Sequence, residues 1–400
     1  MRVVLITEAY DRNMGYLQNS LPKFFGRLGV DMHVITLDLA PYHQFETHRK
    51  AYANFVDKPL IPGTVEQMDG FKLHILGHEP KLGFVRPVGL EEKLRELKPD
   101  ILQTMAAIGW IPLDCARLKK KMRYKLFTAS HYMVVVFPLA TAGLPWFHPK
   151  MVKSFLTRYL HGRWISWQTT QFYGATKDCS EVAVRFFGVQ PSKVSESEIG
   201  VDTEMLRPVS SSEDEAERAQ FRSGFDVKED EILILYTGRL SPEKKTPLLA
   251  QAVAELRAQG EPYRVLFVGD GDDKSAIEKF DGAITTPFVN FKELGKFYRG
   301  ADIGCWPTQE SMSMIDAAAC GLPLLVNHDV RASERYDGNA LKYQLNDLQD
   351  LKAKLLEMKS PDLRATLGKA GSDKIRSQFS WESKAKQRIA DYKAALGIDK

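Results

Sequence analysis

The sequence predicts an α/β fold of two Rossmann-like domains, each built on a parallel sheet. Short apolar runs of strand length alternate with helical patterns in the first half of the chain, and the same alternation restarts near residue 232. A length of 400 residues also exceeds what one hydrophobic core usually serves. We therefore predict a first domain at residues 1–205, a second at 206–378, and a last helix at 379–400.

The elements follow in order along the chain. In the first half, strands are predicted at residues 3–7, 32–36, 100–103 and 125–129, and helices at 16–28 and 91–97. In the second half, strands are predicted at residues 232–236, 264–268, 303–306 and 322–326, and a helix at 248–256. Helices between parallel strands cover both faces of a sheet. The polar stretch at 210–217 is expected to be exposed.

The segment after the strand at 303–306 contains the clearest candidates for ligand-binding residues. Glu310 is followed by Ser311, Met312 and Ser313, and then by a helix of small residues that contains Asp316. The first amides of a helix have no partner within it and carry a partial positive charge, so they suit a phosphate. Asp316 can accept hydrogen bonds from sugar hydroxyls. The pattern favours a nucleotide-sugar site over the alternative, in which the two acids only cap and solvate the helix.

A second candidate element follows the strand at 232–236. The turn after this strand contains Arg239 and Lys244, and a helical pattern comes next. In open α/β sheets, ligands bind at the carboxyl ends of the strands. A guanidinium fork and an ammonium group at that edge form a reasonable pair for a diphosphate, whereas the alternative is a plain surface turn.

Several different short motifs are distributed over almost the whole chain. They are Gly15-Tyr-Leu-Gln-Asn-Ser-Leu21, Gly200-Val-Asp-Thr-Glu-Met-Leu-Arg-Pro208, Gly238-Arg239 with Lys244, Gly269-Asp-Gly271, Phe297-Tyr-Arg-Gly-Ala-Asp302, Ala317-Ala-Ala-Cys-Gly321-Leu-Pro323 and Phe379-Ser-Trp381. In these motifs the chain resembles the retaining glycosyltransferases of family 4. The resemblance implies the GT-B fold, in which two Rossmann-like domains face each other across a cleft and a C-terminal helix crosses back to pack on the first domain.

The resemblance also implies roles for individual residues. The second domain would bind the donor through Arg239 and Lys244 on the diphosphate, the amides at 311–313, and Asp316 on the ribose. Glu310 would face the sugar, and His131, after the strand at 125–129, would face it from the first domain, which binds the acceptor. Gly15 would let the backbone approach the diphosphate or the acceptor closely.

Three departures from the family pattern stand out. Five residues separate Glu310 from Asp316, where the family usually has seven between two glutamates, so the role of Glu310 is less secure than that of Asp316. Ile199 stands where the family usually has Asn, and Lys245 where it often has Gly.

The resemblance further implies metal independence, because cations such as Arg239 and Lys244 serve the diphosphate. We therefore expect no cofactor and interpret Asp270-Gly271-Asp272 as a structural turn rather than a metal site.

We predict a retaining glycosyltransferase that moves a sugar from a nucleotide-diphosphate sugar to a glycan, a lipid-linked acceptor or a small molecule. A nucleotide-sugar epimerase and a non-catalytic sugar-nucleotide-binding protein remain as alternatives. A phosphorylase of this fold would need pyridoxal phosphate on a lysine, and no motif in the sequence indicates one.

Charge is distributed unevenly along the chain. Residues 1–200 carry 26 Lys and Arg against 18 Asp and Glu, and the window 115–177 holds 11 basic residues and no acidic one. Aromatic residues are interleaved with basic ones at 145–173. This stretch is either a helix with a solvated basic face or a surface for an anionic membrane or a phosphate-bearing acceptor. No motif supports nucleic-acid binding.

The cysteines and the apolar runs bear on localisation. The four cysteines show no metal-ligand spacing and are expected to be buried free thiols, as in a reducing compartment. The run at residues 3–7 is too short for a signal peptide, and no apolar stretch reaches membrane-spanning length. We expect a cytoplasmic protein, with peripheral attachment to the inner face of the membrane as a hypothesis.

Overall fold

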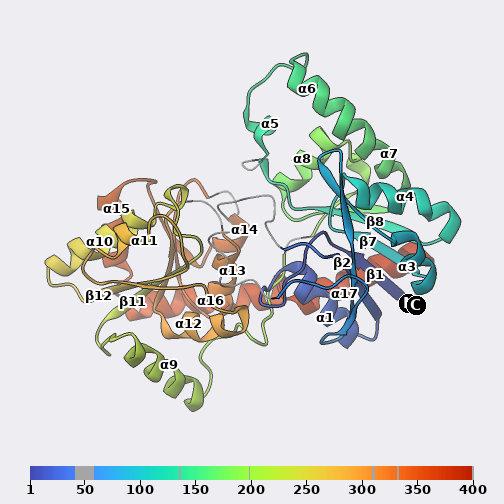
Figure 1. Ribbon diagram of the computed structural model, residues 1–400. Helices are drawn as coiled ribbons and strands as arrows, with labels where there is room; N and C mark the ends of the chain where they lie inside the picture. The colour runs from blue at the N-terminus through green and yellow to red at the C-terminus, as the bar shows by residue number, and fades with distance from the viewer. Residues whose placement is uncertain (41–57, 135–136, 198, 309–310, 331–332, 399–400) are drawn as a thin grey trace. The chain divides into compact units, whose positions relative to one another are not determined.

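The computed structural model describes the chain except for residues 41–57, 135–136, 198, 309–310, 331–332 and 399–400 (Figure 1). The chain divides into two compact α/β units: residues 1–43, 57–200 and 381–400 belong to the first, and residues 201–380 to the second. The predicted α/β fold with parallel sheets in two domains is confirmed. The predicted junctions, at 205/206 and 378/379, lie within five residues of these divisions.

A large sheet forms the centre of the first unit. Its strands are β1 (Arg2–Ile6), β2 (Asp31–Leu37), β3 (Val65–Gln67), β4 (Lys72–Leu76), β7 (Ile101–Thr104), β8 (Lys125–Ser130), β9 (Gln171–Gly174) and β10 (Val194–Glu196). They run in the order β10-β9-β8-β7-β1-β2-β4-β3, and all neighbours are parallel except β3 and β4. The strand order reverses between β1 and β7. A separate antiparallel pair is β5 (His78–Lys81) with β6 (Phe84–Pro87).

Helices cover both faces of this sheet. They are α1 (Leu17–Arg27), α3 (Leu90–Leu97), α4 (Trp110–Met122), α5 (Pro138–Thr141), α6 (Pro149–Ser154), α7 (Leu160–Gln168), α8 (Lys177–Phe187) and α17 (Trp381–Leu396). Val3 and Leu5 of β1 belong to one buried cluster and Val4 and Ile6 to another, as the two-residue period of a strand requires. Burial on both faces explains why the strand is a continuous apolar run.

Helix α17 completes the core of the first unit. Trp381 and Tyr392 are buried in the same cluster as Phe25 of α1, and the rings of Phe25 and Tyr392 meet edge to face with centroids 5.8 Å apart. The Tyr173 hydroxyl of β9 donates to Asp391 Oδ2 at 2.7 Å. The last helix of the chain therefore packs on the first unit, although the whole second unit precedes it in sequence.

The second unit is built on a six-stranded, fully parallel sheet. Its strands are β11 (Ile232–Thr237), β12 (Tyr263–Val268), β13 (Ala283–Thr286), β14 (Ile303–Trp306), β15 (Leu324–Asn327) and β16 (Ala340–Tyr343). Its helices are α9 (Ser212–Gly224), α10 (Thr246–Ala258), α11 (Lys274–Ile277), α12 (Leu294–Gly300), α13 (Met312–Ala319), α14 (Ser333–Tyr336), α15 (Leu348–Glu357) and α16 (Pro361–Gln378). The order β13-β12-β11-β14-β15-β16 reverses between β11 and β14.

The polar stretch at 210–217 differs from its prediction. It forms the start of α9, where the Ser211 side chain accepts from the Asp214 amide and the Asp214 side chain accepts from the Ser211 amide. This reciprocal capping box satisfies two amides that a helix leaves open. Asp214 also pairs with Arg207 at 2.5 Å and is buried, so the prediction of an exposed stretch is wrong at this residue.

Two further expectations can be compared with the structure. All four cysteines are buried and free, as predicted. In the part of the chain that the structure describes, no helix combines the length and hydropathy that crossing a bilayer would need.

Candidate functional site

The reversal of strand order between β11 and β14 determines where a ligand site can form in the second unit. The helices that follow these two strands pack on opposite faces of the sheet at such a point, which leaves a crevice beyond the carboxyl ends of the strands. The turn with Arg239 follows β11, and the segment that leads into α13 follows β14. The topology thus brings together the two motifs that the sequence singles out.

An unusual backbone angle and a side-chain hydrogen bond shape the turn after β11. Gly238 has a φ of +146°, a conformation that L side chains rarely adopt. The buried Tyr236 hydroxyl donates to the Arg239 carbonyl at 2.9 Å, which holds the turn against the strand that leads into it. The Arg239 side chain is 24% exposed and pairs with Glu243 at 3.3 Å. A diphosphate would compete with this weak, partly exposed pair for the guanidinium.

Lys244 ends the short 3₁₀ turn Pro242–Lys244, immediately before α10. Burial, with a smaller contribution from the nearby Arg239, lowers the pKa of its ammonium to about 8. Its neighbour Lys245 has a φ of +50°, in the region that favours glycine. The backbone here therefore keeps the conformation for which the family often uses Gly, although this chain has a lysine.

The N-terminus of α13 forms the other side of the crevice. Ser311 is the N-cap residue, and its hydroxyl accepts from the Ser313 amide at 3.3 Å. A phosphate could receive the Ser313 amide only by displacing that hydroxyl, so the predicted cradle is partly occupied by the protein itself. Met312 is the first residue of the helix. Glu310 lies outside the described residues.

Asp316 lies in the second turn of α13 and is partly buried. Burial raises the pKa of its carboxyl to about 7. The buried Tyr298 of α12 shares a 3.0 Å hydrogen bond with Thr237 at the end of β11. Burial raises the pKa of Tyr298, and the Asp316 carboxylate raises it further. Residues from β11, α12 and α13 therefore lie close together near Asp316.

Three residues for which the sequence predicts no role form hydrogen bonds that stabilise this edge of the sheet. The Trp306 indole donates to the Thr237 carbonyl at 3.1 Å, and the Thr308 hydroxyl donates to the Glu243 carbonyl at 3.0 Å. Asn327, buried at the end of β15, donates to the Pro307 carbonyl at 3.1 Å. These bonds tie the loop after β14 to the turn after β11. In the sequence, the only signal for these three residues is their position at or just after the end of a strand. Many other residues have such a position, so the signal is not specific.

The turn Gly269-Asp270-Gly271 supports the Arg239 turn from the other side. A Cβ at Gly269 would lie 1.9 Å from the Gly238 carbonyl oxygen, and one at Gly271 would lie 2.3 Å from the Leu240 carbonyl oxygen. The Leu240 amide donates to the Asp270 carbonyl at 3.0 Å. This geometry agrees with the structural interpretation of the turn. Within the described residues no group of three or more His, Cys, Asp or Glu side chains is arranged to hold a metal.

Gly15 and His131, the two remaining predicted residues, belong to the first unit. Gly15 follows β1 and stands just before Tyr16, the N-cap residue of α1, at the strand-order reversal of that sheet. His131 follows β8, and burial lowers its pKa to about 4, with a further contribution from Arg388 of α17. The imidazole is therefore neutral at physiological pH, so it can donate and accept hydrogen bonds but carries no charge.

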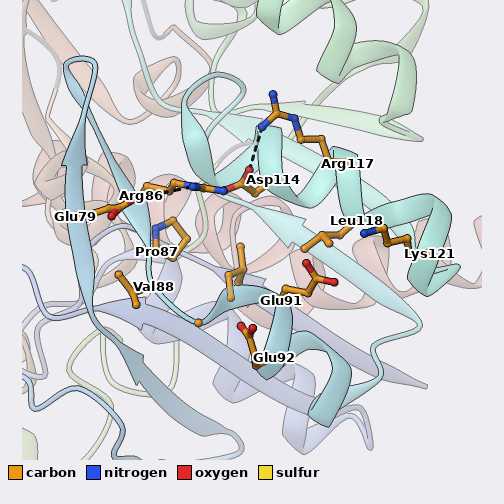
Figure 2. Close-up of a pocket in the computed structure, with 12 residues that line it drawn as sticks. Glu79, Arg86, Pro87, Val88, Glu91, Glu92, Asp114, Arg117, Leu118 and Lys121 are labelled. Atoms are coloured by element: carbon orange, nitrogen blue, oxygen red, sulfur yellow. Dashed lines mark hydrogen bonds and ion pairs between the residues drawn. The ribbon is translucent and has the colours of Figure 1, made fainter.

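A pocket of about 480 Å³ occurs elsewhere in the first unit, between β5, β6, α3 and α4 (Figure 2). Asp114 on its wall pairs with Arg86 at 2.6 Å and with Arg117 at 3.5 Å, which joins β6 to α4. Its three basic side chains face four carboxylates, so it offers no net attraction to an anionic nucleotide. None of the predicted site residues lines this pocket.

Comparison with known proteins adds independent evidence. The family model described as "Glycosyl transferases group 1" matches residues 231–360, the stretch that contains Arg239, Lys244 and Asp316. Two curated relatives are each named D-inositol 3-phosphate glycosyltransferase. That of Kribbella flavida is 27% identical over 236 residues, covering 53% of this chain and 53% of the relative. That of Segniliparus rotundus is 25% identical over 230 residues, covering 53% and 49%. The chain thus spans about half the length of the curated relatives it matches.

Solved structures are similar over nearly the whole chain. Sucrose-phosphate synthase from Thermosynechococcus elongatus has a TM-score of 0.70 at 14% identity, with 100% of both chains covered. The starch synthase IV catalytic domain from Arabidopsis thaliana, bound to ADP and acarbose, has a TM-score of 0.65 at 13% identity, with 99% of both covered. Anabaena HepE in complex with UDP has a TM-score of 0.65 at 13% identity, covering 99% and 100%. These likenesses confirm the GT-B fold class.

The close approach at Gly269 generates a prediction. We expect Gly269→Ala to push the Arg239 turn outward, lower the unfolding midpoint by several degrees and weaken nucleoside diphosphate binding about tenfold, since overpacking against backbone costs roughly 1–3 kcal/mol. Thermal unfolding and calorimetric titration measure the two effects. Gly260→Ala is the matched control, because Gly260 also has a positive φ but an added Cβ there meets nothing within 4 Å. Equal behaviour of the two variants would show that the contact does not shape the turn.

Proposed function

We propose that this chain is a group 1 glycosyltransferase of family 4 and that it transfers a sugar from a nucleotide-diphosphate sugar to an acceptor. The observation that carries the proposal is the strand-order reversal between β11 and β14. Two cations, Arg239 and Lys244, follow the first of these strands, and a helix N-terminus with Asp316 in its second turn follows the other. A diphosphate needs the cations and the helix end, and a ribose needs the carboxylate.

In this proposal the second unit binds the donor. Arg239 and Lys244 neutralise the charge that develops on the leaving diphosphate, and the amide of Met312 at the start of α13 adds to them. Hydrogen-bond donors that are positioned before the reaction stabilise the transition state, and removal of one such donor from an oxyanion site raises the activation free energy by about 3–4 kcal/mol. Asp316 receives the ribose hydroxyls, and Glu310 faces the sugar. Transfer with retention of configuration follows the family resemblance.

The first unit would bind the acceptor near the carboxyl ends of its strands, where Gly15 and His131 lie. A neutral His131 would orient a hydroxyl rather than act as a charged group. The curated relatives are named for D-inositol 3-phosphate, which favours a phosphate-bearing acceptor, and a glycan or lipid-linked acceptor remains within the proposal. Four buried free thiols suit a reducing compartment such as the cytoplasm.

Release of nucleoside diphosphate from a nucleotide sugar tests the function. We expect release that depends on acceptor, persists in excess chelator because side-chain cations serve the diphosphate, and falls strongly in Glu310→Gln. A binding protein would show donor affinity without release, and an epimerase would convert the donor without an acceptor. Abolition by chelator with rescue by Mg²⁺ or Mn²⁺ would overturn the metal-independent proposal.

The two cations generate a second prediction for the site. We expect Arg239→Ala and Lys244→Ala each to weaken nucleoside diphosphate binding about tenfold to hundredfold, because a hydrogen bond to a charged group contributes roughly 1.5–3 kcal/mol. Calorimetric titration measures the affinity. Lys279→Ala, at an exposed lysine of the same unit, is the control and should bind as the unmodified protein does. Unchanged affinity in both site variants would remove them from the diphosphate site.

The raised pKa of Asp316 predicts how donor binding depends on pH. Ribose hydroxyls favour the carboxylate, so binding requires loss of the proton, and affinity should fall as pH drops below about 7. Lys244 acts in the opposite sense, because a diphosphate favours the ammonium, and affinity should also fall as pH rises through about 8. Affinity should therefore be highest between pH 7 and 8 and about tenfold lower at pH 6.

Two variants assign the limbs of this profile. The acidic limb that Asp316 causes should be absent in Asp316→Asn, since the amide does not titrate. The affinity ratio of the unmodified protein to this variant should therefore fall as pH drops below about 7, while ionisation of the phosphate itself cancels in the ratio. Lys244→Arg should flatten the basic limb. An acidic limb of the same size in Asp316→Asn would mean that another group controls it.

A further inference from the structure

The segment from residue 146 to 168 exposes seven large apolar side chains. Helices α6 and α7 are joined by the π-helical turn Phe155–Tyr159, so residues 149–168 form one continuous helical stretch about 30 Å long (Figure 1). A surface helix of a soluble protein normally turns its large apolar residues toward the core and its polar residues toward water. This stretch buries Ile165 but leaves most of its large apolar residues exposed.

Small residues form most of the inner face of the stretch. Ser154, Gly162 and Ser166 are buried. A Cβ at Gly162 would lie 1.8 Å from the Phe187 carbonyl oxygen at the end of α8, and a Cβ at Gly188 would lie 2.4 Å from the Tyr159 carbonyl oxygen. The stretch therefore packs backbone to backbone on α8 at Gly162, with Ile165 as the one large apolar residue buried on this inner face.

Large apolar residues crowd the outer face. Seven of the fifteen exposed large hydrophobic residues in the described part of the chain fall between positions 146 and 167. They are Trp146, Phe147, Val152, Phe155, Leu156, Leu160 and Trp167. Trp146 is 81% exposed at one end and Trp167 61% exposed at the other, with the aliphatic residues between them. A contiguous apolar patch of this kind marks an interaction site rather than scattered surface apolarity.

The charge around the patch has one sign. Lys150 and Lys153 are exposed among the apolar residues, and no acidic residue occurs between positions 115 and 177. Arg158 lies over the Phe137 ring at 5.9 Å, and Arg163 packs against Gly188, so these two are less available to a partner. The outer face thus combines apolar side chains, two lysines and terminal tryptophans.

We propose that the outer face of residues 146–167 lies in the headgroup region of a phospholipid bilayer that carries anionic lipid. Tryptophan rings settle at that depth, aliphatic side chains enter the acyl boundary, and lysines contact anionic headgroups. The opposite charge of the lipid favours it over a second copy of this chain. A symmetric contact would place Lys150 and Lys153 of two copies together, with no acidic residue of the segment to pair them. The attachment is independent of the donor site.

Sedimentation with vesicles tests the proposal. The full chain should bind vesicles of phosphatidylglycerol and phosphatidylcholine at least tenfold more strongly than vesicles of phosphatidylcholine alone, and the difference should shrink in high salt. The variant K150Q/K153Q should lose about tenfold or more on the anionic vesicles, at roughly 1 kcal/mol per lysine. The variant W146S/F147S/W167S should lose binding and the blue shift of tryptophan emission that vesicles cause.

Two controls and one independent readout complete the design. K120Q/K121Q removes two exposed lysines of α4 from the same acid-free window, and Leu82→Ser removes an exposed apolar residue elsewhere; both should bind vesicles unchanged. Calorimetric titration with nucleoside diphosphate should show unaltered affinity in every variant, which confirms that each is folded and separates this inference from the proposed function. Equal binding to both vesicle types, or equal loss in K120Q/K121Q, would overturn the proposal. So would a dimer that W146S/F147S/W167S converts to a monomer, because a second copy would then cover the patch.

Discussion

The hydrogen bond from the Trp306 indole to the Thr237 carbonyl, 3.1 Å long and buried, is the contact on which the candidate site of the second unit depends. It joins the last residue of β14 to the last residue of β11, at the place where the sheet reverses its order. Without it, a buried carbonyl would lack its partner at a cost of about 1–3 kcal/mol. In addition, the loops that follow β11 and β14 would no longer be held in a fixed position relative to each other. Arg239 and Lys244 lie on one loop, and Asp316 lies beyond the other.

Local patterns explain why much of this arrangement could be predicted. The run at 232–236 is apolar and of strand length, and β11 extends from Ile232 to Thr237. The strand at 303–306 has the predicted bounds, and the predicted helix start after Glu310 is where Ser311 caps α13. Period and capping act over a few residues, so a sequence displays them directly. The strand predicted at 322–326 begins two residues later, at Leu324, because Pro323 has no amide to pair.

Contacts between distant segments could not be predicted in the same way. Gly238 and Gly269 lie 31 positions apart, and only the fold shows that a side chain at Gly269 would collide with the carbonyl of Gly238. The hydrogen bond between the Ser313 amide and the Ser311 hydroxyl joins residues only two positions apart. The sequence nevertheless does not show whether this amide donates to a capping side chain or to a ligand. Aromatic and basic residues alternate so densely at 145–173 that periodicity does not show which face is buried. The close contact of Gly162 with α8 determines which face of the helix is buried.

Two ionisable groups of the proposed donor site, Lys244 and Asp316, have pKa values near physiological pH. Burial lowers the pKa of Lys244 to about 8 and raises that of Asp316 to about 7, so each group is shifted toward its uncharged form near physiological pH. A diphosphate supplies the negative charge that Lys244 lacks, and ribose hydroxyls supply the donors that Asp316 lacks. In the proposed function, the ligand would stabilise both charged forms at once, which offsets part of the cost that burial imposes on them. A phosphate alone would stabilise only the Lys244 ammonium, and a nucleoside alone only the Asp316 carboxylate. The proposed site would consequently favour a ligand that carries both groups in one molecule, as a nucleotide-diphosphate sugar does.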